Sequence, residues 1–159
     1  MIKIIRADLT NTHHADALVF LLNAYALDPM GGGKELSDFT KDNLASEILK
    51  RTDTTVILAF DDDKPAGLIN CIEGFSTFKC KPLINIHDVY IDEDHRGKGL
   101  ATQLLQAAED LAIEKGCCKV TLEVLEGNEP AKIAYLKFGF DGYELDPKMG
   151  KAMFWEKTL

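Results

Sequence analysis

Apolar residues recur along the chain at two spacings, and each spacing predicts a different kind of element. Short β-branched and apolar runs between turn residues predict five strands, at Ile2–Arg6, Thr54–Phe60, Ala66–Phe78, Leu83–Ile91 and Val120–Val124. Helical spacing predicts four helices: one capped by Asn11 or Thr12 and running through Tyr25, one beginning at Ser37 or Asp38, one from Leu100 to a C-cap at Gly116, and one over Ala131–Phe138. Two further strands are expected at Gly139–Phe140 and Lys151–Lys157.

The order of these elements predicts an α/β fold with a mixed sheet. Tight turns at Asp61–Pro65 and Lys79–Pro82 indicate hairpins, which pair strands antiparallel. From Leu83 to Val124 the chain runs strand, helix, strand, a crossover that joins two parallel strands. We therefore expect a central, mostly antiparallel twisted sheet of about seven strands with helices on both faces.

The turn from Asp92 to Thr102 joins a predicted strand to a predicted helix and carries two glycines and two cations. A helix N-terminus has unpaired backbone N–H groups and the positive end of the helix dipole, which suits a phosphate. Gly97 and Gly99 lack the Cβ atoms that would keep a phosphate away from the backbone, and Arg96 and Lys98 add positive charge. The turn is therefore a candidate phosphate-binding loop.

Two common phosphate motifs do not match this turn. The dinucleotide fingerprint lacks its third glycine, and the ATP-binding loop lacks both its first glycine and the Ser or Thr after Lys98. The pattern that does match is Arg-x-x-Gly-x-Ala, from Arg96 to Ala101. It resembles the pyrophosphate loop of the GNAT superfamily, the acyl-CoA-dependent N-acetyltransferases, with Ala101 replacing the commoner second glycine.

A second segment strengthens this resemblance. Asn128 to Phe140 is similar to the GNAT signature Asn-x-x-Ala-x-x-x-Tyr-x-x-x-Gly-Phe, and it follows Arg96 after one helix and one strand. The element order is also the one expected of the GNAT fold. Together these features cover nearly the whole chain, so the resemblance implies one N-acetyltransferase domain over residues 1–159 and acetyl-CoA as cosubstrate.

The resemblance implies a role for each matching residue. Backbone groups that a diverging strand leaves free would bind the pantetheine arm, at Val89, Tyr90 and Ile91. The pyrophosphate would lie on the turn, at Arg96, Gly97, Lys98, Gly99, Leu100, Ala101 and Thr102. Asn128 would bind the pantetheine or order its loop, and Tyr135 would protonate the departing thiolate. These roles predict direct transfer of an acetyl group to an amine in a ternary complex.

An attacking amine must first lose a proton, because a lysine-like amine has a pKa of about 10.4 and is charged at neutral pH. Candidate acceptors of that proton are His87, Asp88, Glu73 and a chain of waters, and His87 has the most suitable intrinsic pKa. His87 and Asp88 are neighbours in a strand, so only one is expected to face the site. The segment Ile86–Ile91 also resembles the place where polyamine acetyltransferases carry an acidic pair.

Composition narrows the classes of partner. The net charge of −8 argues against general nucleic-acid binding, and it is compatible with a small cationic amine as acceptor. No apolar run approaches the roughly 20 residues that cross a bilayer, so we expect a cytoplasmic protein without a membrane partner. The four cysteines show no metal-ligand spacing, which predicts reduced thiols and no metal.

Two alternative functions stay open at this point. The acceptor could be a peptide or protein amine, or the domain could bind acyl-CoA as a sensor without catalysis. A homodimer is also expected by analogy with the family, since the predicted edge strand at Lys151–Lys157 could pair across a two-fold axis.

Overall fold

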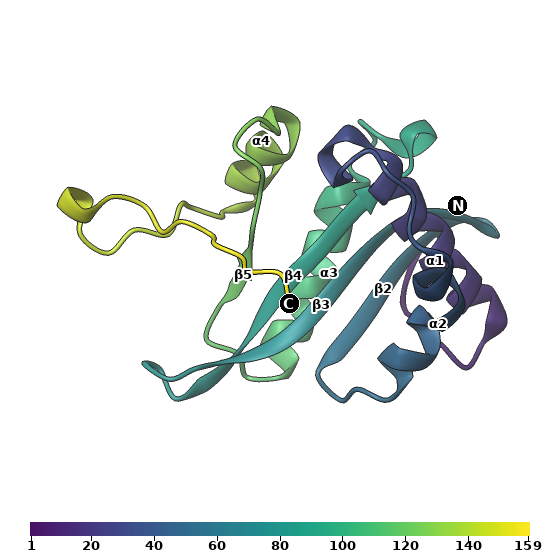
Figure 1. The fold of residues 1–159 in the computed structure, drawn as a ribbon, viewed down its shortest axis with the longest axis horizontal. Helices are drawn as coiled ribbons and strands as arrows, with labels where there is room; N and C mark the ends of the chain where they lie inside the picture. The colour runs from purple at the N-terminus through teal and green to yellow at the C-terminus, as the bar shows by residue number, and fades with distance from the viewer.

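A five-stranded mixed sheet lies at the centre of the molecule, in a computed structural model that describes residues 1–159 (Figure 1). Its strands, in spatial order, are β1 (Ile2–Arg6), β2 (Thr54–Asp61), β3 (Lys64–Ser76), β4 (Lys81–Ile91) and β5 (Val120–Leu122). The first four pair antiparallel, and β5 pairs parallel to β4. The predicted mixed, mostly antiparallel sheet is confirmed, with five strands in place of about seven.

Four helices and three short 3-10 turns complete the fold. The helices are α1 (Thr12–Leu27), α2 (Asp38–Leu49), α3 (Leu100–Glu114) and α4 (Glu129–Phe138), and the turns are η1 (Pro29–Gly31), η2 (Glu93–His95) and η3 (Pro147–Met149). The predicted N-caps explain where two helices begin. Asn11 accepts a hydrogen bond from the His13 amide, and Ser37 accepts one from the Thr40 amide.

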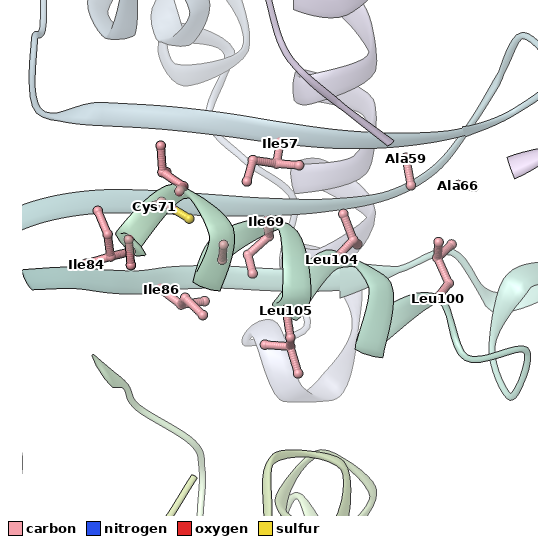
Figure 2. Packing of buried hydrophobic residues seen from close by; sticks show 13 residues of the cluster. Ile57, Ala59, Ala66, Ile69, Cys71, Ile84, Ile86, Leu100, Leu104 and Leu105 are labelled. Atoms are coloured by element: carbon pink, nitrogen blue, oxygen red, sulfur yellow. The ribbon is translucent and has the colours of Figure 1, made fainter. Parts of the chain in front are cut away.

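Each face of the sheet has its own hydrophobic core, because successive side chains of a strand point to opposite faces. Along β2, Ile57 and Ala59 pack on the side of α3, whereas Leu58 and Phe60 pack on the side of α1. Figure 2 shows the first core, in which Leu100, Leu104 and Leu105 of α3 lie against β3 and β4. Helices therefore cover both faces, as predicted.

The two C-terminal strands predicted at Gly139–Phe140 and Lys151–Lys157 do not form, and this prediction is wrong. After α4 the chain leads out to η3 and then turns back, and its only strand-like pairing is a bridge between Glu144 and Lys151 (Figure 1). Large apolar side chains on this segment are exposed: Tyr143, Leu145, Met149, Met153, Phe154 and Trp155. The sequence pattern shows only that these side chains suit a pleated, half-buried surface. A strand also needs a partner strand, and this segment has none.

No helix in the structure is long and apolar enough to cross a membrane.

We expect Leu104→Ala to lower the free energy of unfolding by about 2–5 kcal/mol, because Leu104 is fully buried between α3 and the sheet. Urea titration followed by circular dichroism measures the change. Ile113→Ala, at a 69% exposed position of the same helix, is the control and should stay within about 0.5 kcal/mol of the parent. Equal losses in the two variants would contradict this assignment of the core.

Candidate active site

The strand β4 contains one residue more than its partner β3 at the middle of the sheet. Asn70 pairs with Asp88 while Cys71 pairs with Ile86, so His87 is the extra residue of a β-bulge. Before the bulge Ile86 faces α3; after it Val89 faces α3 and Tyr90 faces α1. The bulge therefore reverses the alternation of the β4 side chains between the two faces of the sheet. As a result, Asp88 lies on the same face as Asn70.

Beyond the bulge, β4 and β5 part. The parallel pairing covers only Ile84–Ile86 of β4 and Val120–Leu122 of β5. Residues Val89–Ile91 keep their pairing with β3, but their other edge has no strand partner. This is the arrangement expected for Val89, Tyr90 and Ile91, and it leaves backbone groups that an extended ligand can pair with.

The glycine-rich turn follows directly and leads into α3. Gly97 and Gly99 have φ of 73° and 79°, a left-handed conformation that favours glycine. Gly99 occupies the N-cap position of α3, and no side chain caps this helix. The first-turn amides of Leu100, Ala101 and Thr102 therefore lack an intrahelical acceptor, and such amides can bind an anion.

The two cations of the turn contact the protein itself. Arg96 donates from Nε to the carbonyl of Ile91 at 3.0 Å and pairs with Asp28 at 3.0 Å, and its guanidinium lies 5.6 Å from the centre of the Tyr90 ring. Lys98 donates to the carbonyl of Asp94 at 2.7 Å. The Met30 amide, and then the Arg96 guanidinium, hold the pKa of the Asp28 carboxyl below its usual range, so this carboxylate stays ionised. Arg96 thus joins the turn to the segment that follows α1.

The second signature segment forms the start and the inner side of α4. Asn128 is the N-cap of α4, and its Oδ1 accepts from the Ala131 amide at 3.3 Å. Tyr135 packs against the α3-side core, and its ring meets Phe140 edge-on at 6.0 Å between centroids. Burial raises the pKa of Tyr135 to about 12, so its phenol keeps its proton at neutral pH.

The three candidate proton acceptors occupy different surroundings. His87 is exposed on the bulge. Asp88 is half-buried and accepts from Asn70 at 2.9 Å between Nδ2 and Oδ2. Glu73 pairs with Lys115 at 2.7 Å on the α3 side of the sheet, opposite the face that carries Asp88. The geometry therefore brings His87 and Asp88 to the bulge and places Glu73 elsewhere.

Sequence reasoning missed two residues near the bulge. Tyr25, at the end of α1, lies with its ring 6.0 Å from that of Tyr90. Burial, followed by the negative charges of Asp88 and Asp28, raises the pKa of Tyr25. Asn70 is 6% exposed, and its Oδ1 is buried without a hydrogen-bond partner. The sequence does carry one sign of this residue, an amide side chain within the apolar run of β3. An amide is unexpected there, because an unpaired buried acceptor costs about 1–3 kcal/mol.

The structure contains no group of three or more His, Cys, Asp or Glu side chains that could hold a metal ion.

Comparison with known proteins gives a family. Residues 19–140 match the model of the acetyltransferase (GNAT) family. Among curated relatives, the thialysine N-epsilon-acetyltransferase of Bos taurus is 31% identical over 66 residues, which are 42% of this chain and 38% of the relative. The streptothricin acetyltransferase of Streptomyces lavendulae is 40% identical over 63 residues, 40% of this chain and 33% of the relative.

The first curated relatives are longer than the matched part, which spans between 33% and 44% of their lengths. Among solved structures, AAC(6')-Iy in complex with a bisubstrate analogue of CoA and acetylneamine superposes with a TM-score of 0.77. It is 18% identical, and the match covers 100% of this chain and 99% of that one, which shows a shared fold. The family model covers most of this chain, and the chain belongs to the GNAT family of acetyltransferases.

Proposed function

We propose that the protein transfers the acetyl group of acetyl-CoA to a primary amine of a small, cationic molecule. The observation that carries this proposal is the parting of β4 and β5 directly before an uncapped helix N-terminus. The edge of Val89, Tyr90 and Ile91 would pair with the pantetheine arm as an added strand does. The amides of Gly97 to Thr102 would bind the pyrophosphate, and Asn128 would order the loop before α4.

The proposed reaction is direct attack within a ternary complex. The amine nitrogen forms a bond to the thioester carbon, the carbon–sulfur bond breaks, and the sulfur leaves with the bonding electrons. Tyr135 donates its proton to that sulfur as general acid, and His87 receives the proton of the amine directly or through water. With its pKa raised to about 12, the Tyr135 phenol is protonated at neutral pH, as a general acid must be.

Two observations support a small cationic acceptor. The chain has a net charge of −8, which attracts cations over a distance. The relatives reported above are named for acetylation of thialysine and of streptothricin. The cytoplasmic location stays a prediction.

Glycine at position 99 should be required for acetyl-CoA binding. Gly99→Ala places a side chain at φ 79°, so we expect roughly tenfold weaker binding as the first turn of α3 shifts. Gly116→Ala is the matched control: φ is 69°, a Cβ there also meets open space, and it lies at the other end of α3. Calorimetric titration with acetyl-CoA measures both variants.

If the parent protein takes up no acetyl-CoA, the proposed function is wrong. Thiol release with a panel of small amines, aminoglycosides and peptides then tests transfer. Binding without thiol release across the whole panel would instead support a non-catalytic acyl-CoA sensor.

Tyr135→Phe should lower kcat roughly a hundredfold or more while leaving the KM for acetyl-CoA near that of the parent. Because the pKa of Tyr135 is raised to about 12, the acid form persists through the alkaline range, and the parent should lose no rate to its ionisation below about pH 11. Tyr143→Phe, at an exposed tyrosine, is the control. A kcat within twofold of the parent would remove the role from Tyr135.

We also propose a homodimer in which the exposed C-terminal segment of one copy packs beside β5 of the other. β5 is an edge strand, and a hollow of about 350 Å³ lies beside it between α3 and the end of α4. Its lining is mainly apolar, with Ala112, Ile113, Val120, Phe138 and Phe140 among its residues. Apolar side chains on the segment and an apolar hollow at a free edge are complementary in character.

The double change Phe154→Ser and Trp155→Ser should convert a dimer to a monomer in light scattering coupled to size exclusion, because both side chains are exposed on the C-terminal segment. Phe78→Ser, at a 92% exposed position of the β3–β4 turn, should leave the mass unchanged. In the dimer, fluorescence of the one tryptophan, Trp155, should shift to the blue. A parent protein that is monomeric at every concentration would contradict the proposal.

A further inference from the structure

We propose that Asp28 and Arg96 position one wall of the acceptor site, and that the Arg96 side chain does not bind the pyrophosphate of acetyl-CoA. This inference rests on the proposed function, and it departs from the role that the family resemblance gives Arg96. The wall consists of Tyr25 at the end of α1 and the segment of residues 28–33 that follows it. Asp28 is the positioning residue of this wall, and Arg96 connects it to β4.

The donors of Arg96 are directed into the protein. Its Nε donates to the Ile91 carbonyl at 3.0 Å, its Nη2 donates to Asp28 Oδ2 at 3.0 Å, and its backbone amide donates to the Glu93 carbonyl at 3.3 Å. The guanidinium also lies over the Tyr90 ring. To reach a phosphate, this side chain would have to give up a charge-assisted hydrogen bond, whereas the first-turn amides of α3 have no intrahelical acceptor. The amides can therefore bind the pyrophosphate without Arg96.

The Ile91 carbonyl belongs to the edge of β4 that has no strand partner. The Asp92 amide donates to the Ala66 carbonyl at 3.0 Å, so the backbone of Asp92 is directed toward β3. Because consecutive residues of a strand direct their N–H and C=O groups to opposite sides, those of Ile91 point away from β3. Arg96 therefore bonds the free edge itself, and the same guanidinium holds Asp28 beside that edge.

Asp28 organises the segment that it begins. Its carboxylate accepts from the Met30 amide at 2.9 Å, and its carbonyl accepts from the amides of Gly31 and Gly33 at 2.8 Å and 3.1 Å. Gly31 lies so close to α1 that a Cβ there would fall 1.9 Å from the Tyr25 carbonyl oxygen. One residue thus fixes the segment against α1, and its ion pair fixes the segment against the free edge of β4.

The wall borders the place where the amine would meet the thioester. The ring of Tyr25 lies 6.0 Å from that of Tyr90, which packs on the α1 side of the sheet. Burial, followed by the negative charges of Asp88 and Asp28, raises the pKa of Tyr25, which places its phenol near both carboxylates. The wall therefore extends along the α1 face from Ile91 toward the bulge.

A wall that is fixed before the acceptor arrives favours acceptor binding, because it loses less conformational entropy when the complex forms. Three consecutive glycines, Gly31 to Gly33, make this segment costly to order. The contact between Asp28 and Arg96 offsets part of that cost in the free protein. It should therefore act on the affinity for the amine, and leave the chemical step and acetyl-CoA binding unchanged.

Asp28→Asn tests the positioning role, because the amide side chain can still accept from the Met30 amide but lacks the charge that pairs with Arg96. The KM for a small amine should rise roughly five- to tenfold, with kcat and the calorimetric Kd for acetyl-CoA within about twofold of the parent. Arg96→Gln should raise the amine KM by a similar factor, and the double variant should show no further rise. Independent structural damage would instead add across the two changes and lower kcat.

The same titrations separate positioning from phosphate binding. If the Arg96 side chain bound the pyrophosphate, Arg96→Gln would weaken acetyl-CoA binding roughly tenfold or more and would reduce the salt dependence of that binding. We expect neither change. Gly99→Ala, which should bind acetyl-CoA weakly, shows that the titration detects a change in the turn.

Asp53→Asn is the matched control, since Asp53 pairs with Arg51 at 2.6 Å just before β2, and its amine KM should equal that of the parent. Circular dichroism and urea midpoints establish folding, and Arg96→Gln serves if Asp28→Asn fails to fold. An unchanged amine KM in a folded Asp28→Asn would overturn the positioning role and leave the proposed function in place. Weaker acetyl-CoA binding by Arg96→Gln alone would return Arg96 to the pyrophosphate. A parent without acetyl-CoA uptake, or without amine-dependent thiol release, would overturn the proposed function and this inference with it.

Discussion

A single extra residue in β4 exchanges the faces to which all later side chains of that strand point. Without the bulge, regular alternation through His87 would put Asp88 and Tyr90 on the α3 side together with Ile86. With it, Asp88 meets Asn70 and Tyr90 packs against α1. The bulge also lies where β5 leaves the sheet, so one local irregularity both frees a backbone edge and chooses the side chains beside it.

The contact between Asp28 and Arg96 connects the two parts of the site. Exposed ion pairs contribute little to stability, typically about 0–1 kcal/mol, so its importance is geometric. Arg96 bonds the end of β4 and the residue after α1 at the same time, and Asp28 also accepts from the Met30 amide. The segment that follows α1 and the glycine-rich turn are therefore held together through one side chain.

Stability and the site make opposing demands on the middle of the sheet. The fold alone would favour an apolar side chain at position 70, where β3 is otherwise buried and apolar. Similarly, an uncapped α3 leaves first-turn amides unsatisfied, whereas a Ser, Asp or Asn side chain at a helix N-cap would accept a hydrogen bond from one of them. Both departures lie around the proposed site, which is where local rules are expected to give way to function.

The sequence by itself determined what depends on neighbours along the chain. Capping at Asn11 and Ser37, the strands β1 to β4 and the strand–turn–helix around Gly97 and Gly99 follow from short-range pattern, and the family follows from the two signatures. Only the tertiary structure decided which groups meet across the sheet, because one bulged residue shifts register without a mark in the sequence. It paired Arg96 with Asp28, put Glu73 on the opposite face from Asp88, and brought Tyr25 and Asn70 to the site. It also left the residues after Phe138 without a sheet partner, since strand formation depends on a second strand that local sequence cannot supply.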